Sequence, residues 1–189
     1  WPQVTAVAVD TQPYHAAGAS ETQDLGIALS TGVAYLRALT AAGLTIDQAA
    51  RQIAFTVPVG ADQFVAIAKL RALRRLWARV TEASGASEGA QAIRRLHAIT
   101  ATRGLSRRDP WVNLLRATVT TFAAGVGGAD SVTTLPFDAA LGVSDAFARR
   151  IARNTQVILQ EESSLIRVID PAGGSWFVER LTDQLAEAA

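Results

Sequence analysis

Short, nearly continuous apolar runs alternate with longer amphipathic segments along most of this chain. The first run, Val4 to Val9, has too few polar residues for a strand with one solvated face, so it predicts a strand buried on both faces. Three later runs have the same character and predict three further strands. They cover residues 52–57, 95–100 and 131–135.

The segments between these runs carry helix signals. Ser20 followed by Gln23 has the spacing of a capping box, and Gly43 predicts the end of the helix that begins there. In the next helix, apolar residues recur at helical spacing, while arginines recur every fourth residue on another face. The apolar stripe consists of Ala66, Leu70, Leu73, Trp77 and Val80, and the arginines are Arg71, Arg75 and Arg79.

The second half of the chain continues the alternation. Asp109 and Pro110 predict the N-cap and first turn of a third helix, which Gly125 to Gly128 should end. Ser144 is the predicted cap of a fourth helix. A short extended piece at residues 166–169 and a Pro-Ala-Gly-Gly turn should then lead into a terminal helix.

Strands that alternate with helices of this length favour a parallel sheet with right-handed crossover helices. Four such units make half of an eight-stranded barrel, whose usual length is about 250 residues. The pattern leaves a small doubly wound sheet open as the alternative. Gly125 to Gly128 follows a helix rather than the first strand, so the sequence lacks the usual phosphate-binding loop of a nucleotide-binding sheet.

Composition narrows the class of protein. With 49% hydrophobic and 19% charged residues, the 189-residue chain should form an ordered domain with a sizeable core. A net charge of +1 gives no basis for binding nucleic acid or an anionic membrane. The absence of cysteine excludes disulfides and thiolate chemistry, and we expect a cytoplasmic location. The chain begins at Trp1 without an initiator Met or a signal peptide, which predicts a fragment of a longer protein.

Six segments carry a specific resemblance to one enzyme family. They are AGAS (17–20), GVAYLRA (32–38), IAKLRA (67–72), DPWVNLLRAT (109–118), RIARNTQVILQEES (150–163) and DPAGGSWFVE (170–179). In their order and spacing, the chain resembles the methylmalonyl-CoA mutase family from residue 4 to residue 185.

This resemblance implies an α/β fold in which the chain forms the C-terminal half of a (β/α)8 TIM barrel. Residues 1–165 would be four β/α units of the mutase domain, and residues 166–189 a post-barrel extension and helix. Such enzymes interconvert methylmalonyl-CoA and succinyl-CoA, with the thioester along the barrel axis and adenosylcobalamin across the carboxyl ends of the strands. The cofactor supplies the radical chemistry, and the protein positions it and shields the radicals.

The first strand end departs from the pattern of active members, which have Tyr-His, a short spacer and Glu-Ala-Gly-Ala there. Alignment on Ala17 to Ala19 places Gln12 and Pro13 at the Tyr-His positions and Ala16 at the Glu position. His15 is a catalytic candidate only if two residues are deleted. Without that deletion, we expect His15 to be an exposed loop imidazole.

The next strand ends depart as well. His97 matches the family's third-strand His, but Ile99 replaces a Gln that reaches the thioester, and Ile has no hydrogen-bonding group. Thr102 and Arg103 replace Gly-Trp, and Arg103 would crowd the corrin. After the fourth strand, Pro136 and the run Asp138-Ala139-Ala140 replace an Asn and an Asp-Glu-Ala.

Strand ends are the functional face of such barrels, so a preserved scaffold with altered strand ends is typical of a non-catalytic subunit. The resemblance is therefore to the small subunit of the heterodimeric bacterial mutase. Its large subunit would be the partner and would bind adenosylcobalamin, with no cofactor expected in this chain. The cobalt-ligand motif Asp-x-His-x-x-Gly is absent from the sequence.

The candidate site residues are few. His15 and His97 are the candidate catalytic residues, and no cofactor or metal ligand is assigned. Arg71 matches a basic helix position that could meet CoA phosphates, although a solvated face or a salt bridge is the alternative. Two other functions stay open: an active mutase of altered specificity that uses His15, and an unrelated small parallel-sheet binding domain.

Overall fold

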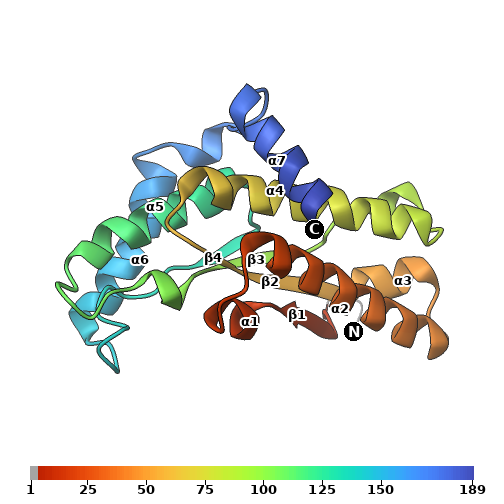
Figure 1. The fold of residues 1–189 in the computed structure, drawn as a ribbon, viewed down its shortest axis with the longest axis horizontal. Helices are drawn as coiled ribbons and strands as arrows, with labels where there is room; N and C mark the ends of the chain where they lie inside the picture. The colour runs from red at the N-terminus through yellow and green to blue at the C-terminus, as the bar shows by residue number, and fades with distance from the viewer. Residues whose placement is uncertain (1–3) are drawn as a thin grey trace.

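The computed structural model describes residues 4–189, so Trp1 lies outside the described residues. Four strands form one parallel sheet in the order β1-β2-β3-β4 (Figure 1). The strands are β1 (Val7–Asp10), β2 (Ile53–Val59), β3 (Leu96–Thr100) and β4 (Ser131–Thr133). All four predicted strands are present with shifted ends, and the consecutive order contains no reversal of the kind that defines a doubly wound sheet.

Helices follow the strands in the expected alternation. The α-helices are α1 (Gln12–Ala16), α2 (Glu21–Ala41), α3 (Ile46–Arg51), α4 (Gln63–Ala83), α5 (Val112–Val126), α6 (Ala146–Glu161) and α7 (Trp176–Ala188). Three single-turn 3₁₀ helices are η1 (Glu88–Ala90), η2 (Thr102–Gly104) and η3 (Leu165–Arg167). The predicted extended piece at 166–169 is wrong, because η3 and bends occupy that stretch.

The structure tests three predicted helix caps. The capping box of Ser20 and Gln23 is confirmed, with both reciprocal hydrogen bonds present. The Asp109 cap is wrong: its φ of 46° is left-handed, whereas a cap residue needs extended backbone, and α5 begins three residues later. The Ser144 cap is also wrong, because the neighbouring Asp145 accepts the Ala148 N–H at 2.7 Å.

The hydrophobic core lies between one face of the sheet and the helices. Alternate residues of β2, namely Ile53, Phe55, Val57 and Val59, are buried there. Phe55 packs edge-on against Trp77 of α4, with ring centroids 4.9 Å apart. Consecutive helices contact one another across this face, α2 with α4, α4 with α5, and α5 with α6. The predicted apolar stripe of α4 is therefore the side that covers the sheet.

The opposite face of the sheet carries a row of polar residues. Thr56, His97 and Ser131 are register partners there, so they form one row across three strands. None of the three belongs to the hydrophobic core, and Ser131 is exposed. The two faces of the same sheet are thus chemically different. The face away from the helices is not the apolar layer that usually fills a TIM barrel.

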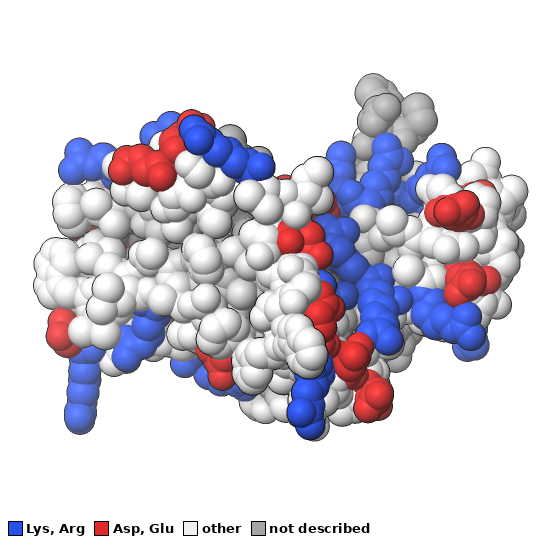
Figure 2. All heavy atoms as spheres, turned by 90° about the horizontal axis from the view of Figure 1, so that it is seen from above, with Lys and Arg blue, Asp and Glu red and all other residues white. Residues whose placement is uncertain are grey.

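Helix α7 lies on the outer side of α4, away from the strands (Figure 1). Val178, Thr182 and Leu185 are its buried residues. Basic and acidic side chains are interspersed on this side of the molecule rather than segregated by sign (Figure 2). Among the helices of residues 4–189, none combines the length and the apolar character needed to cross a membrane.

Candidate functional site

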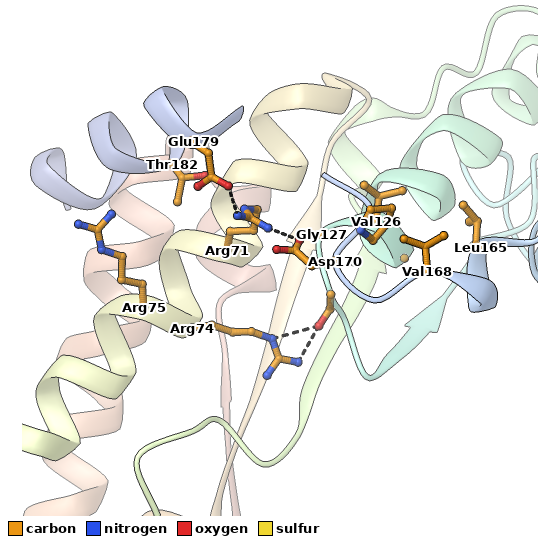
Figure 3. A pocket seen from close by; sticks show the side chains of 13 residues that line it. Arg71, Arg74, Arg75, Val126, Gly127, Leu165, Val168, Asp170, Glu179 and Thr182 are labelled. Atoms are coloured by element: carbon orange, nitrogen blue, oxygen red, sulfur yellow. Dashed lines mark hydrogen bonds and ion pairs between the residues drawn. The ribbon is translucent and has the colours of Figure 1, made fainter. Parts of the chain in front are cut away.

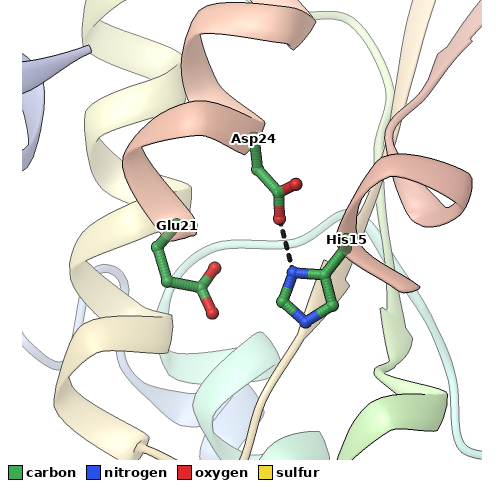
Figure 4. Close-up of side chains that lie close together, drawn as sticks. All are labelled: His15, Glu21 and Asp24. Carbon is green, nitrogen blue, oxygen red and sulfur yellow. Dashed lines mark hydrogen bonds and ion pairs between the residues drawn. The ribbon is translucent and has the colours of Figure 1, made fainter. Parts of the chain in front are cut away.

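The carboxyl end of β1 leads directly into the short helix α1, which carries His15. Gln12 and Pro13 form the first turn of α1 rather than the end of a strand. The His15 side chain is only 3% exposed, and its Nδ1 lies 2.7 Å from Asp24 Oδ2 (Figure 4). The expectation of an exposed loop imidazole is therefore wrong, because α1 folds back onto the first turn of α2.

Lys69 of α4 lies at the centre of this buried group. Its side chain is fully buried, and its Nζ donates to Asp24 Oδ2 at 2.6 Å and to the Pro58 carbonyl at 2.9 Å. Glu21 Oε2 lies 2.5 Å from the same ammonium as an ion pair, outside hydrogen-bonding geometry. The ammonium thus has two hydrogen-bond acceptors, and its charge lies beside two carboxylates of the same protein.

His15, Glu21 and Asp24 also present ligand atoms within 4.8 Å of one another, which is the arrangement of a small metal site. The Lys69 ammonium, however, lies within 2.6 Å of both carboxylates. A metal ion bound to those oxygens would face a positive charge at contact distance. We conclude that the ammonium is the cation of this cluster and that these residues do not fit a metal.

Sequence reasoning missed the roles of Lys69, Glu21 and Asp24. One signal was available: Lys69 is the only lysine among 18 basic Lys and Arg residues. It also lies between Ala66 and Leu70 in the stripe of α4 that faces the core. A lone lysine within an apolar stripe indicates a buried charge with a partner, but only the fold brings α2 against α4 and identifies that partner.

His97 lies on β3, on the face of the sheet away from the helices. Its Nδ1 is 2.8 Å from Ser131 Oγ, and its Nε2 is 3.0 Å from Thr133 Oγ1. Both ring nitrogens are therefore engaged with hydroxyl groups of β4. The neighbouring Ile99 shares this face and is half-buried. His97 and His15 do not meet, because His15 is enclosed on the helical side between α1, α2 and α4.

Arg71 lies on the outer face of α4 and contacts the C-terminal segment. Its guanidinium pairs with Asp170 and, at 2.6 Å, with Glu179 of α7 (Figure 3). The hydrogen bond to Asp170 raises the pKa of Arg71 above its ordinary value, against the opposing effect of burial, and Glu179 raises it further. This pair of ion pairs borders a cavity of about 660 Å³.

The substituted strand ends have definite structural roles. Arg103, in η2 after β3, donates from Nη1 to the carbonyl of His15 at 2.9 Å and to the carbonyl of Ala19 at 3.1 Å. Asp138, after β4, accepts the Asp145 N–H at 3.1 Å. Burial raises the pKa of Asp138, but hydrogen bonds from Ser144 and from Asp145 outweigh it and hold that pKa below its ordinary value. Pro136 and Ala139 form a turn in the same loop.

The whole chain, residues 1–189, matches the protein-family model described as methylmalonyl-CoA mutase. The chain belongs to the methylmalonyl-CoA mutase family. It is 62% identical to the methylmalonyl-CoA mutase small subunit of Streptomyces virginiae, covering 100% of this chain and 30% of that protein. It is 50% identical to the small subunit of Propionibacterium freudenreichii subsp. shermanii, with the same coverage of each chain.

Similarity to a protein named simply methylmalonyl-CoA mutase is lower. The Escherichia coli (strain K12) protein of that name is 39% identical, over 100% of this chain and 26% of its own length. The chain therefore spans about a third or less of the relatives that it matches. Within the mutase family, its higher identities are to proteins named as small subunits, as the substituted strand ends indicated.

Proposed function

We propose that this chain is part of the small subunit of an adenosylcobalamin-dependent methylmalonyl-CoA mutase and performs no chemistry itself. The holoenzyme would interconvert methylmalonyl-CoA and succinyl-CoA, with a large subunit as the partner in a heterodimer. One observation carries this proposal. The two candidate histidines are both held by the protein's own side chains, His15 by Asp24 and His97 by two hydroxyl groups of β4.

The proposed scaffold is the C-terminal half of a TIM barrel, with residues 166–189 as an extension packed on its outside. Support comes from the consecutive order of four parallel strands and from helices that cover only one face. Such a sheet curls toward its uncovered face when further β/α units continue it. The row of Thr56, His97 and Ser131 would then face the barrel interior.

The family implies adenosylcobalamin, and the residues of this chain do not fit it. A corrin ring needs unoccupied space above the carboxyl ends of the strands. Here Arg103, which follows β3, extends across that region and donates to the carbonyls of His15 and Ala19. Ile99 offers no hydrogen bond toward that region. We propose that the large subunit holds the cofactor, and we assign no step of the reaction to this chain.

Arg71 was a candidate contact for CoA phosphates. Its guanidinium already pairs with Asp170 and Glu179, so a phosphate would have to displace two carboxylates. We propose instead that Arg71 anchors the C-terminal extension. For the whole protein we propose a cytoplasmic location, with no nucleic-acid or membrane partner.

The competing function, an active mutase that uses His15, requires that ring to reach a substrate. A 3% exposed side chain bonded to a fully buried Asp24 is poorly placed for that role. The His15→Ala variant separates the two functions. If His15 were catalytic, turnover of the purified holoenzyme would fall by orders of magnitude.

The decisive experiment is co-expression of the full-length small subunit with its large subunit. We expect stoichiometric co-purification, cobalamin absorbance in the complex, and no such absorbance when the small subunit is isolated and incubated with cobalamin. A cobalamin spectrum that stays with the isolated small subunit through gel filtration would refute the proposal. The isolated large subunit, incubated in the same way, is the positive control.

A further inference from the structure

The short helix α1 lies at the carboxyl end of the sheet. It follows β1 after a single residue, contacts β2, and contacts η2, which follows β3. In Figure 1, α1 lies beside the end of β1. The carboxyl ends of parallel strands are where α/β proteins bind their ligands. The chain's own backbone thus occupies the place where a ligand would approach.

One attachment of α1 is a buried charge network. His15 is bonded to Asp24, which is bonded in turn to Lys69, and all three side chains are 3% exposed or less. Lys69 also donates to the carbonyl of Pro58, near the carboxyl end of β2. The network therefore ties α1 to α2, to α4 and to the sheet at once, with the glutamate Glu21 as its partly exposed edge.

The other attachment is the exposed Arg103 of η2. Its guanidinium donates to the carbonyl of His15, the next-to-last residue of α1, and to the carbonyl of Ala19 in the turn that follows. That turn passes through Gly18 at a φ of 113°, a left-handed conformation that a side chain would resist. Arg103 thus joins the carbonyls on either side of this turn, and the His15 carbonyl also accepts the Gly18 N–H at 3.0 Å.

We propose that α1 is a fixed cover over the carboxyl ends of β1 to β3, held from inside by Lys69 and Asp24 and from outside by Arg103. Arg103 is a positioning residue in this arrangement, since it acts on α1 through backbone carbonyls. The cover goes beyond the proposed function, because it holds whether or not the parent protein supports mutase activity.

Hydrogen exchange of the full-length protein, followed by mass spectrometry, tests this cover. In Arg103→Gln, the amides of residues 14–19 should exchange about tenfold faster, because two charge-assisted hydrogen bonds are lost. Lys69 supplies a second readout. As the only lysine in this stretch, it should be acetylated by an amine-directed reagent faster in Arg103→Gln than in the wild type.

Arg107→Gln is the matched control, since Arg107 is an exposed arginine in the same loop. It should leave both readouts at the wild-type level. Equal exchange of residues 14–19 in the two variants would overturn the proposal. If Arg103→Gln folds poorly, Arg103→Ala removes both donors without adding another polar group, and should show at least the same acceleration of residues 14–19. Wild-type rates in Arg103→Ala would equally count against the proposal.

Discussion

At the scale of single residues, Lys69 is a fully buried ammonium whose partners lie on two other elements, α2 and β2. A fully buried ammonium needs a countercharge and hydrogen-bond acceptors. Asp24 and the Pro58 carbonyl accept hydrogen bonds from it, and Glu21 adds a second ion pair. All the other Lys and Arg residues of this sequence are arginine. The planar guanidinium group of an arginine is too large to take the compact position of the Lys69 ammonium. The lysine is therefore specific to its site.

Replacing Lys69 with Met should remove the ammonium from the buried Asp24 carboxylate and leave His15 as the remaining side-chain partner of Asp24. We expect the free energy of unfolding to fall by about 3 kcal/mol, which is the lower end of the range for removing one partner of a buried ion pair. The loss should lie at the lower end because Glu21, the other carboxylate, is partly exposed to water. Urea denaturation of the full-length protein measures this loss. The double variant with Asp24→Asn should recover part of it. Arg79→Met, on an exposed position of the same helix, should change stability little, and an equal loss there would contradict the prediction.

At the scale of elements, ion pairs join helices that are distant in the sequence. Arg71 and Arg75 of α4 pair with Glu179 and Asp183 of α7, so the four-residue spacing on each helix matches. Because both pairs advance in the same direction, the two helices run parallel here. The arginine row was visible in the sequence, but its acidic partners lie about a hundred residues away and become neighbours only through the fold.

Arg71→Met should loosen α7 more than Arg75→Met does. Arg71 has two carboxylate partners and is 17% exposed, whereas Arg75 has one partner and is 63% exposed. We expect losses of about 1–2 kcal/mol for Arg71 and under about 1 kcal/mol for Arg75. Hydrogen exchange of the α7 amides reports both. Equal acceleration in the two variants would show that Arg71 is an ordinary surface pair.

The contact between α3 and η1 should depend on pH. Asp47 accepts hydrogen bonds from the Oγ and the N–H of Ser87, which hold its pKa below the ordinary value of 3.8. A lowered pKa in the folded state gives stabilisation that is present above the unfolded pKa and is lost as the pH falls through the folded pKa. Asp47→Ala should therefore destabilise the protein at pH 6, with the difference shrinking below about pH 4.

Thermal unfolding of wild type and Asp47→Ala, measured from pH 6 to pH 3, checks this expectation. Ser87→Ala removes the side-chain hydrogen bond, which lowers the pKa of Asp47 most, and keeps the backbone donor. In a protein that carries Ser87→Ala, the effect of Asp47→Ala should therefore change less between pH 6 and pH 3. A difference between wild type and Asp47→Ala that stays constant over the whole pH range would contradict the assignment.

At the scale of the whole molecule, the sheet has two edge strands, β1 and β4, and one face without helices. Unpaired edges recruit other strands unless they are covered. The uncovered face is less apolar than a half-barrel predicts, since Thr56, His97 and Ser131 line it. Exposed edges rather than an apolar interior are therefore the main reason to expect association.

Expressed alone, residues 1–189 should dimerise or aggregate. Sedimentation velocity over a range of concentrations measures the state, with the full-length protein as the control that should not show the same association. A monomer that melts cooperatively would contradict the half-barrel proposal, because it would mean that the edges need no partner.

The sequence by itself determined the alternation of elements, the buried stripe of α4, the capping box of α2 and the family. These depend on neighbours within a few residues, or on motifs that survive intact. It misplaced the caps at Asp109 and Ser144. Asp109 has a left-handed backbone and α5 begins after Trp111 without a side-chain cap, whereas Asp145, the neighbour of Ser144, caps α6. Only the tertiary structure decided that the side chains of His15 and Lys69 are buried and paired with Asp24.

The physical reason is the distance along the sequence between the residues that interact. A helix period or a cap is set by contacts across one or two turns of chain, whereas burial is set by which elements pack together. Asp24 and Lys69 are 45 residues apart, and Arg103 is 88 residues from His15. No local pattern encodes such pairs. The sequence therefore determined that this is a mutase-family scaffold with altered strand ends, and the packing of α1 decided that its histidine is enclosed.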